Sequence, residues 1–401
     1  MKSDSPNAPD ALSRKHHRRE IESLDALQAA LDQGQALRGW VVQGLSLCEL
    51  HGIESANWDG CLFWGCDFGS PGLQAMIVER GGIIIPRFEG LPFETDRTIL
   101  YTPDALYEGF DEAGYEGSLD YRIYLQSHTE RLHPGGRSLY QSLAERLHDH
   151  SIFDALEEYV FENASNGVVA LMGGHAVGRD EALYRQVAQL AQQLAASGFL
   201  LLTGGGPGVM EAANLGARLA DCSTQDLDEA ITLLARAPHF EPDPQAFVAQ
   251  ARQVIERFSA HKPRPNLAIP TWFYGHEPSN LFATAVAKFF DNAVREESIV
   301  ALPTEGIVFA PGSAGTMQEI FQDLAQNHYN TYGKRSPMVF FGESHRRVYE
   351  LIRAFVAEKG VEHKYGQLLA LFTEVQETVD FLVDARKASE ISRASEISTT
   401  R

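Results

Sequence analysis

Two glycine-rich turns constrain the fold of this chain more than any other feature of its sequence. The turns span residues 204–208 and 311–316, and each follows a short apolar run that begins with glycine. Such runs are typical of buried strands in a parallel sheet. Residues 209–217 and 317–324, which follow the turns, carry apolar side chains three and four positions apart, and this spacing predicts helices packed on that sheet.

Each turn therefore joins the carboxyl end of a predicted strand to the N-terminus of a predicted helix. Glycines leave backbone N–H groups accessible, and the helix dipole adds positive potential. Because the carboxyl ends of parallel strands share one edge of a sheet, we expect the two turns to lie together. The sequence thus predicts an anion site at this edge, and a phosphate group is the anion that suits it best.

Strands and helices alternate along the chain from Gly167 onward. The predicted strands are residues 168–172, 198–203, 267–270, 306–310 and 338–342, and the predicted helices include 181–196 and 281–296. Residues 221–258 interrupt this alternation with a helical insertion. The pattern predicts an α/β fold, with an open parallel Rossmann-like sheet and helices on both faces, and we assign this domain to residues 163–386.

The N-terminal part of the chain shows a different spacing, of five residues. Large apolar side chains recur at this interval in two series, Leu37, Val42 and Leu47, then Trp58, Phe63 and Phe68. The spacing resembles the pentapeptide repeat, whose right-handed β-helix turns a corner every five residues. A β-meander is an equally good interpretation.

The remaining N-terminal and C-terminal boundaries follow from composition. Further strands predicted at residues 81–86 and 98–101 complete a small β-rich module over residues 21–105, and residues 106–162 are interpreted as a helical connector. Residues 1–20 and 387–401 are polar or nearly repetitive, and both are predicted to be disordered tails.

Composition excludes several classes of function. The chain has 401 residues and a net charge of −20, which argues against the broad cationic surface that binds nucleic acid polymers or anionic membranes. Four cysteines and the lack of an apolar segment of spanning length predict a reduced, soluble, cytoplasmic protein. Cys48, His51, Cys61 and Cys66 have no usual zinc-ligand spacing, so no metal site is predicted and Cys61 and Cys66 are expected in the interior.

Four segments together carry a resemblance to a known family. They are Met172-Gly173-Gly174, residues 204–211, Arg295 and residues 311–319. These segments resemble the LOG family, long labelled lysine decarboxylase-like, and the resemblance covers about residues 165–385. The family pattern Pro-Gly-Gly-x-Gly-Thr-x-x-Glu is matched except at Ser313, where the family has glycine. The family's Arg-Lys pair is replaced by Arg295-Glu296, and residues 277–280 resemble a Glu-x-Pro-Asn segment of some longer members.

Known LOG proteins are phosphoribohydrolases that cleave nucleoside 5'-monophosphates into free base and ribose 5-phosphate. The resemblance implies the same N-glycosidase reaction here, without a cofactor, in a homodimer or larger homo-oligomer that completes its pockets across subunits. It assigns catalysis to Glu319, which would orient or deprotonate the attacking water, and to Arg295, which would neutralise the phosphate or hold Glu319. The residues assigned to substrate and phosphate binding are Gly173, Gly174, Gly204, Gly205, Gly206, Gly208, Met210, Gly312, Ser313, Ala314, Gly315 and Thr316.

Other interpretations of the same residues stay open at this point. Thr316 and Glu319 also form a Thr-x-x-Glu capping box, which would explain both by helix initiation alone. Arg295, taken alone, is better explained as a surface residue beside Glu296 and Glu297. His175, in the turn after the first strand of the domain, is given no role in the mechanism.

Three alternative functions are weighed against hydrolysis. The first is a carrier or sensor that binds a nucleotide or phosphorylated cofactor without turnover, and Ser313 and Glu296 favour it. The second is a pyridoxal-dependent decarboxylase, because residues 259–262 resemble a Ser-x-His-Lys segment, although a match of four residues is weak evidence. The third is an interaction surface on the N-terminal module.

Overall fold

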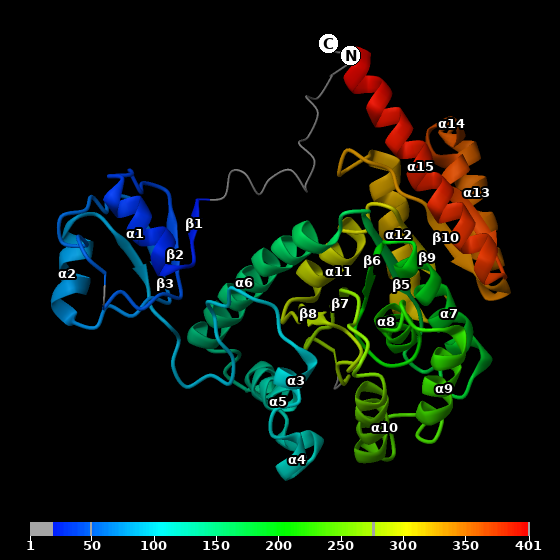
Figure 1. The fold of residues 1–401 in the computed structure, drawn as a ribbon, viewed down its shortest axis with the longest axis horizontal. Coiled ribbons are helices and arrows are strands. Elements are labelled where there is room, and N and C mark those ends of the chain that lie inside the picture. Colours follow the sequence, from blue (N-terminus) through cyan, green and yellow to red (C-terminus); the bar gives the residue numbers. More distant parts are fainter. Residues whose placement is uncertain (1–18, 49, 275–276, 400–401) are drawn as a thin grey trace. The chain divides into compact units, whose positions relative to one another are not determined.

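A computed structural model describes residues 19–48, 50–274 and 277–399 of the chain (Figure 1). The predicted tail over residues 1–20 lies almost wholly outside the described residues. The chain forms two compact units, which we call the larger and the smaller unit. Of the described residues, the larger unit contains 101–124 and those from 159 onward, whereas the smaller unit contains residues 19–100 and 125–158.

The larger unit is built on one sheet of seven parallel strands, in the order β11-β10-β9-β5-β6-β7-β8. These strands are β5 (Val168–Met172), β6 (Leu200–Thr203), β7 (Asn266–Ala268), β8 (Ala285–Val286), β9 (Gly306–Phe309), β10 (Met338–Phe341) and β11 (Leu369–Phe372). Every residue of β5, β6, β9 and β10 is buried, as expected for a sheet that helices cover on both faces. The prediction of an open parallel α/β sheet is confirmed.

Helices surround this sheet (Figure 1). They are α7 (Ala182–Ala196), α8 (Val209–Arg218), α9 (Thr224–Leu234), α10 (Pro244–Arg257), α11 (Asn292–Ala301), α12 (Ala314–Tyr329), α13 (Arg346–Glu358), α14 (Glu362–Tyr365) and α15 (Val375–Thr399), with α3 (Pro103–Leu106) and α4 (Phe110–Ala113) from the earlier segment. Helices α7 and α8 pack on each other and on β6, α8 also packs on β5 and β7, and α11 packs on α12. The predicted helical insertion over residues 221–258 is confirmed as α9 and α10.

The strand order places a topological switch point beside β5. From β5 the chain moves outward through β6, β7 and β8, and then returns to lay β9 against the opposite side of β5. In open α/β sheets, ligands bind in the crevice that such a reversal opens at the carboxyl ends of the strands. The two glycine-rich turns follow β6 and β9, so both lie at this edge.

Two predicted elements are wrong. Residues 281–291 are not helical: they contain the short strand β8, and the helix predicted over 281–296 begins only at Asn292. The reason is that Leu281, Phe282, Val286 and Phe289 are all buried, so this segment lacks the single apolar face that a surface helix needs. The strand predicted at 98–101 is reduced to one antiparallel bridge between Tyr101 and Val286.

The C-terminal tail differs from its prediction. Helix α15 continues through Thr399, whereas residues 387–401 were expected to be disordered. The repeated segment contains alanine and glutamate, which are good helix formers, and no glycine or proline that would end the helix, so low complexity does not prevent helix formation there. Within the described residues, no helix combines the length and the apolar character needed to cross a bilayer.

The smaller unit is a stack of coils. Its strands β1 (Glu20–Ile21), β2 (Val41–Gln43), β3 (Leu62–Trp64) and β4 (Ile83–Ile85) pair in parallel in this order. The unit also contains α1 (Leu24–Asp32), α2 (Pro71–Glu79) and the adjoining parts of α5 (Leu119–Leu132) and α6 (Leu139–Asn163). Residues 125–158 therefore group with the N-terminal module, which differs from the separate connector assigned to residues 106–162.

Each coil takes 21 residues, because Glu20 pairs with Val41, Val41 with Leu62, and Leu62 with Ile83. The two five-residue series are offset by the same interval, so Val42 and Phe63 are paired, and all six side chains are buried. Parallel pairing excludes the β-meander, whose strands are antiparallel. The five-residue spacing thus marks successive sides of a coil, as in the repeat that it resembles.

Glycines stand at one corner of every coil. Gly39, Gly60 and Gly81 have φ values of +74°, +70° and +84°, and the N–H of each of the first two donates to the carbonyl of the next at 2.8 and 2.9 Å. A Cβ on Gly81 would lie 3.1 Å from the Cα of Asp59, so a side chain meets backbone there. Cys61 is buried as expected and burial raises its pKa to about 12, while Cys66 is half-buried.

Gly81→Ala is expected to destabilise the smaller unit by about 1 to 3 kcal/mol, because alanine is strained at this φ and its Cβ meets Asp59. Urea unfolding followed by tryptophan fluorescence measures the change, since Trp58 and Trp64 lie in this unit. The matched control is Gly72→Ala in α2, where an added Cβ meets open space and stability should rise by up to about 1 kcal/mol. Equal stability of the two variants would contradict the corner assignment.

Candidate functional site

Three loops meet at the carboxyl edge of the large sheet. They follow β5, β6 and β9, and they are tied by backbone hydrogen bonds. The Gly174 N–H donates to the Pro311 carbonyl at 2.9 Å, and the Val209 N–H donates to the Gly174 carbonyl at 3.1 Å. The structure therefore brings together both glycine-rich turns and the Gly173-Gly174 turn, as the sequence predicted.

The close approach of these loops leaves no room for side chains at several of the glycines. A Cβ on Gly208 would lie 2.5 Å from the Gly174 carbonyl oxygen, and one on Gly312 would lie 2.2 Å from Thr316 Oγ1. Gly315 differs, because a Cβ there would meet no atom of the described residues outside its own helix. Packing therefore explains Gly208 and Gly312, whereas the bare surface at Gly315 is free to receive a ligand.

The two turns differ in exposure. Gly204, Gly205, Gly206 and Gly208 are buried, and Met210 covers them, with Sδ and Cε within 3 Å of where Cβ atoms on Gly204 and Gly206 would stand. In contrast, residues 312–315 are exposed. The first turn forms the floor of the crevice, and the second presents its backbone to solvent.

Helix α12 begins at this exposed turn. Its N-cap is Ser313, whose side chain makes no capping hydrogen bond to the described backbone, so the first N–H groups of this helix of 16 residues point outward. An accessible helix N-terminus with glycines around it favours an anion. Ser313 is exposed and does not fill the space between the turns.

The capping-box interpretation of Thr316 and Glu319 is wrong. Ser313 is the N-cap, so Thr316 is already the third residue of the helix and its hydroxyl lies against Gly312. A capping box does occur elsewhere, where Ser223 and Asp226 begin α9. Helix initiation therefore does not account for Glu319.

Glu319 is buried beside a charged pair. Its side chain is 7% exposed, and burial raises its pKa to about 8, partly opposed by Arg295 and reinforced by Glu296. A carboxyl group whose pKa lies near neutrality can exchange a proton with substrate or water. Since the same helix begins with the exposed turn, one element carries both an anion site and a titratable carboxyl group.

Arg295 is also buried, so the surface-residue interpretation is wrong. On α11 its Nε donates to the Ile269 carbonyl at 2.9 Å and its Nη1 donates to Glu296 Oε1 at 2.6 Å. Its Nη2 reaches the first turn, where it lies 2.7 Å from the position that a Cβ on Gly204 would occupy. Glu296, which replaces the family's lysine, thus neutralises part of the charge of Arg295.

The sequence analysis missed the side chains that hold the loop after residue 276. The Asn280 N–H donates to the Gly205 carbonyl at 2.9 Å, and Ser279 Oγ donates to Asp120 Oδ2 at 3.2 Å. Asp120 pairs with Lys288 at 2.8 Å, and both side chains are 1% exposed. Asp120 and Lys288 are 168 residues apart, so no local pattern could have paired them.

Glu277 opens this loop and was singled out only through the family resemblance of residues 277–280. Its Oε1 lies 3.3 Å from His175 Nδ1, and its Oε2 would lie 3.2 Å from a Cβ on Gly206. His175, which had been given no role, therefore faces the first turn together with Glu277.

Lys262, the residue on which the decarboxylase alternative depends, is exposed and precedes β7. It lies at the amino end of that strand, whereas the glycine turns lie at the carboxyl ends. This position removes the support for that alternative. Within the described part of the chain, no group of three or more His, Cys, Asp or Glu side chains is arranged to hold a metal ion.

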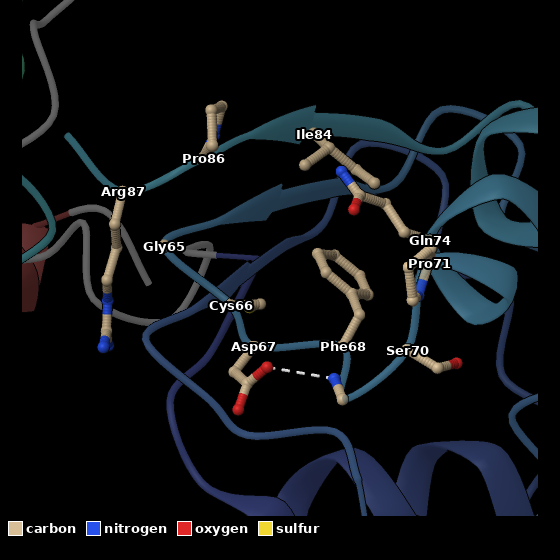
Figure 2. Close-up of a pocket in the computed structure, with 11 residues that line it drawn as sticks. Gly65, Cys66, Asp67, Phe68, Ser70, Pro71, Gln74, Ile84, Pro86 and Arg87 are labelled. Atoms are coloured by element: carbon tan, nitrogen blue, oxygen red, sulfur yellow. Dashed lines mark hydrogen bonds between the residues drawn. The ribbon is translucent and has the colours of Figure 1, made fainter. Parts of the chain in front are cut away.

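The smaller unit has a cavity of its own, of about 380 Å³ (Figure 2). It is formed by the turn over residues 65–70, the start of α2 and the residues after β4, including Asp67 and Arg87. Asp67 Oδ1 accepts a hydrogen bond from the Gly69 N–H at 2.9 Å. None of the predicted site residues lies in this cavity.

Residues 166–224 match the sequence profile of the SLOG cluster4 family, part of the SMF/DprA-LOG superfamily. The match contains β5, β6 and the turns that follow them. Over these residues the chain is similar to this LOG-related family, as the motifs indicated. The seven-stranded parallel sheet is of the Rossmann-like α/β type, in which ligands bind at the carboxyl ends of the strands. No curated protein matches the chain.

Solved structures with some likeness to the chain include two proteins. One is the molybdenum cofactor binding protein from the phototrophic bacterium Rippkaea orientalis, with 16% identity, coverage of 54% of this chain and 94% of that one, and a TM-score of 0.34. The other is the molybdenum cofactor carrier protein from Chlamydomonas reinhardtii, with 15% identity, coverage of 53% and 94%, and a TM-score of 0.33. Because these scores are low, the fold class rests on the observed sheet.

The raised pKa of Glu319 predicts a pH-dependent stability. The folded state holds this proton more tightly than the unfolded state, so stability is present below pH 4.5 and is lost as pH rises through about 8. Glu319→Gln removes this loss, and its free energy of unfolding should exceed that of the wild type by up to about 5 kcal/mol above pH 8.

Urea unfolding at a series of pH values between these limits measures the difference. Glu350→Gln, at an exposed position on α13, is the control and should differ from the wild type by a small, constant amount. A gap between Glu319→Gln and the wild type that does not widen with pH would show that Glu319 is ionised in the folded protein.

Proposed function

We propose that this protein hydrolyses the N-glycosidic bond of nucleoside 5'-monophosphates to free base and ribose 5-phosphate. The observation that carries the proposal is the buried Glu319 in the helix whose exposed N-terminus suits a phosphate. A 5'-phosphate at residues 312–316 would bring the ribose toward Glu319, because both groups belong to α12.

The residues supply a complete reaction. Glu319, in its ionised form, takes a proton from a water molecule while the water oxygen bonds to the anomeric carbon, and the bond from that carbon to the base breaks. The base leaves with the electron pair of that bond and takes up a proton from bulk water, and Glu319 then releases the proton it accepted to solvent. Until its proton transfer is complete, the negative charge of Glu319 acts on the oxocarbenium-like ribose, while the cation of Arg295 acts on the phosphate.

A homodimer or larger homo-oligomer in the cytoplasm is part of the same proposal. The exposed second turn supports it, since a partner subunit could close the crevice above residues 312–315. The proposed substrate is a small molecule, with no nucleic acid polymer and no membrane involved.

A carrier that binds a nucleotide or phosphorylated cofactor without turnover is the second candidate. The ion pair between Arg295 and Glu296 favours it, because an arginine already paired at 2.6 Å gives less stabilisation to charge that develops during a reaction. The phosphate would then bind at the N-terminus of α12, and Glu319 would take no part in a reaction and would only balance the charge of Arg295.

Incubation with AMP, GMP, CMP, UMP and IMP, followed by chromatography for free base, separates the two candidates. Base release by the wild type should fall by roughly two to four orders of magnitude in Glu319→Gln and in Arg295→Ala. Glu350→Gln should keep wild-type activity. A melting temperature that rises with nucleotide while no base appears would establish the carrier instead.

The pH profile provides a second test of Glu319. Because the ionised carboxylate is the base, kcat/KM should increase with pH until it levels off above about 8, the raised pKa of Glu319 in the free protein. A profile that falls over this range would assign Glu319 the opposite role, of a proton donor.

A further inference from the structure

A cavity of about 290 Å³ adjoins the first glycine turn in the larger unit. Its lining comes from the loops after β5 and β6, from residues 238–241 between α9 and α10, and from Glu277 and Pro278. This volume is close to the lower end of the range for small-molecule sites, about 300 Å³. The insertion that interrupts the strand–helix alternation thus provides one wall of a space beside the crevice.

The wall from the insertion is aromatic and firmly supported. Phe240 packs edge-on against Phe247, with ring centroids 5.6 Å apart, and against Tyr115 at 5.2 Å. The Arg179 guanidinium lies 3.3 Å from the centre of the Phe247 ring and makes a bidentate pair with Glu211, at 2.6 and 2.8 Å. Because this support is buried, Phe240 presents its ring from a preorganised position.

The opposite end of the cavity is polar. Glu277 and His175 face each other at 3.3 Å with their side chains about half exposed, so both can contact a ligand. The backbone of this end is fixed, since the Glu277 carbonyl accepts from Lys288 Nζ at 3.4 Å and Asn280 is bound to the first turn. A carboxylate accepts hydrogen bonds, and therefore favours a ring that carries N–H donors.

The cavity and the proposed ribose site share the first turn. Gly206 separates Glu277 from Met210, and Met210 in turn lies beside Gly204 and Arg295. A nucleotide could place its phosphate at residues 312–316 and its sugar over this turn. Its base would then point toward the cavity.

We propose that this cavity is the subsite for the leaving base, in which Phe240 stacks on a planar heteroaromatic ring and Glu277, with His175, accepts its N–H donors. The inference rests on the proposed nucleotide substrate. It identifies specificity-determining residues in the α9–α10 insertion and in the loop at residue 277, neither of which the sequence analysis had assigned to the site.

The test compares two ligands by calorimetric titration, in the Glu319→Gln background so that no turnover occurs. AMP carries a base, and ribose 5-phosphate lacks it. Phe240→Ala should weaken AMP binding by about tenfold or more, the range found when a base loses its stacking partner. Glu277→Gln should also weaken it by about tenfold, because it removes the charge of the carboxylate that accepts the N–H donors of the base. Both variants should leave the affinity for ribose 5-phosphate within about twofold. Phe161→Ala, an exposed aromatic position on α6, is the control and should change neither affinity.

Selective loss of AMP affinity supports the subsite. An unchanged affinity for AMP, or an equal loss for both ligands, overturns it. Glu277→Gln replaces an exposed side chain of the same size, so it keeps the test valid if Phe240→Ala does not fold. Because binding is measured, absence of hydrolysis in the wild type would reject the proposed reaction alone, whereas the loss of AMP affinity would still identify the subsite.

Discussion

Close backbone contact among three loops is the constraint on which the larger unit depends. The Gly174 N–H reaches the Pro311 carbonyl, and Gly208 lies so near the Gly174 carbonyl that a methyl group would clash with it. This contact joins the loops after β5, β6 and β9 at the switch point, and it fixes the positions at which α8 and α12 begin. The positions of Met210, Glu319 and the exposed turn at residue 313 follow from it, because all three are carried by those two helices.

Three buried ionisable side chains lie beside this contact, and Arg295 interacts with both Glu296 and Glu319. Arg295, Glu296 and Glu319 together carry one negative charge when all are ionised, and burial makes that state costly. The raised pKa of Glu319 relieves the cost by keeping a proton on the carboxyl group at neutral pH. A phosphate that drew Arg295 away from Glu296 would change this balance, so ligand binding and the protonation of Glu319 are coupled.

The sequence predicted the parts of the structure that depend on local pattern. The strands before both turns, the helices after them and the buried face of the coils each rest on spacing within about ten residues, and these predictions are confirmed. The helix predicted over residues 281–296 failed because apolar residues on all sides of that segment imitate part of a helical period. Phe240 and the pair of Asp120 with Lys288 stayed hidden because their partners are distant in sequence. The spacing of five left coils and a β-meander equally open, and only the parallel strand register decided for coils and revealed their length.

The segment over residues 101–124 has a consequence for how the chain is made. Tyr101 exchanges two backbone hydrogen bonds with Val286, and Asp120 has its cation at Lys288. More than a hundred further residues must therefore be translated before residues 101–124 can pair with the large sheet. Until then the carboxylate of Asp120, which is buried in the folded protein, remains exposed to water. Since residues 125–158 belong to the smaller unit, each unit is interrupted by the other along the chain. Cleavage of the chain at one position therefore does not separate the two units, and each must fold from segments that the other unit interrupts.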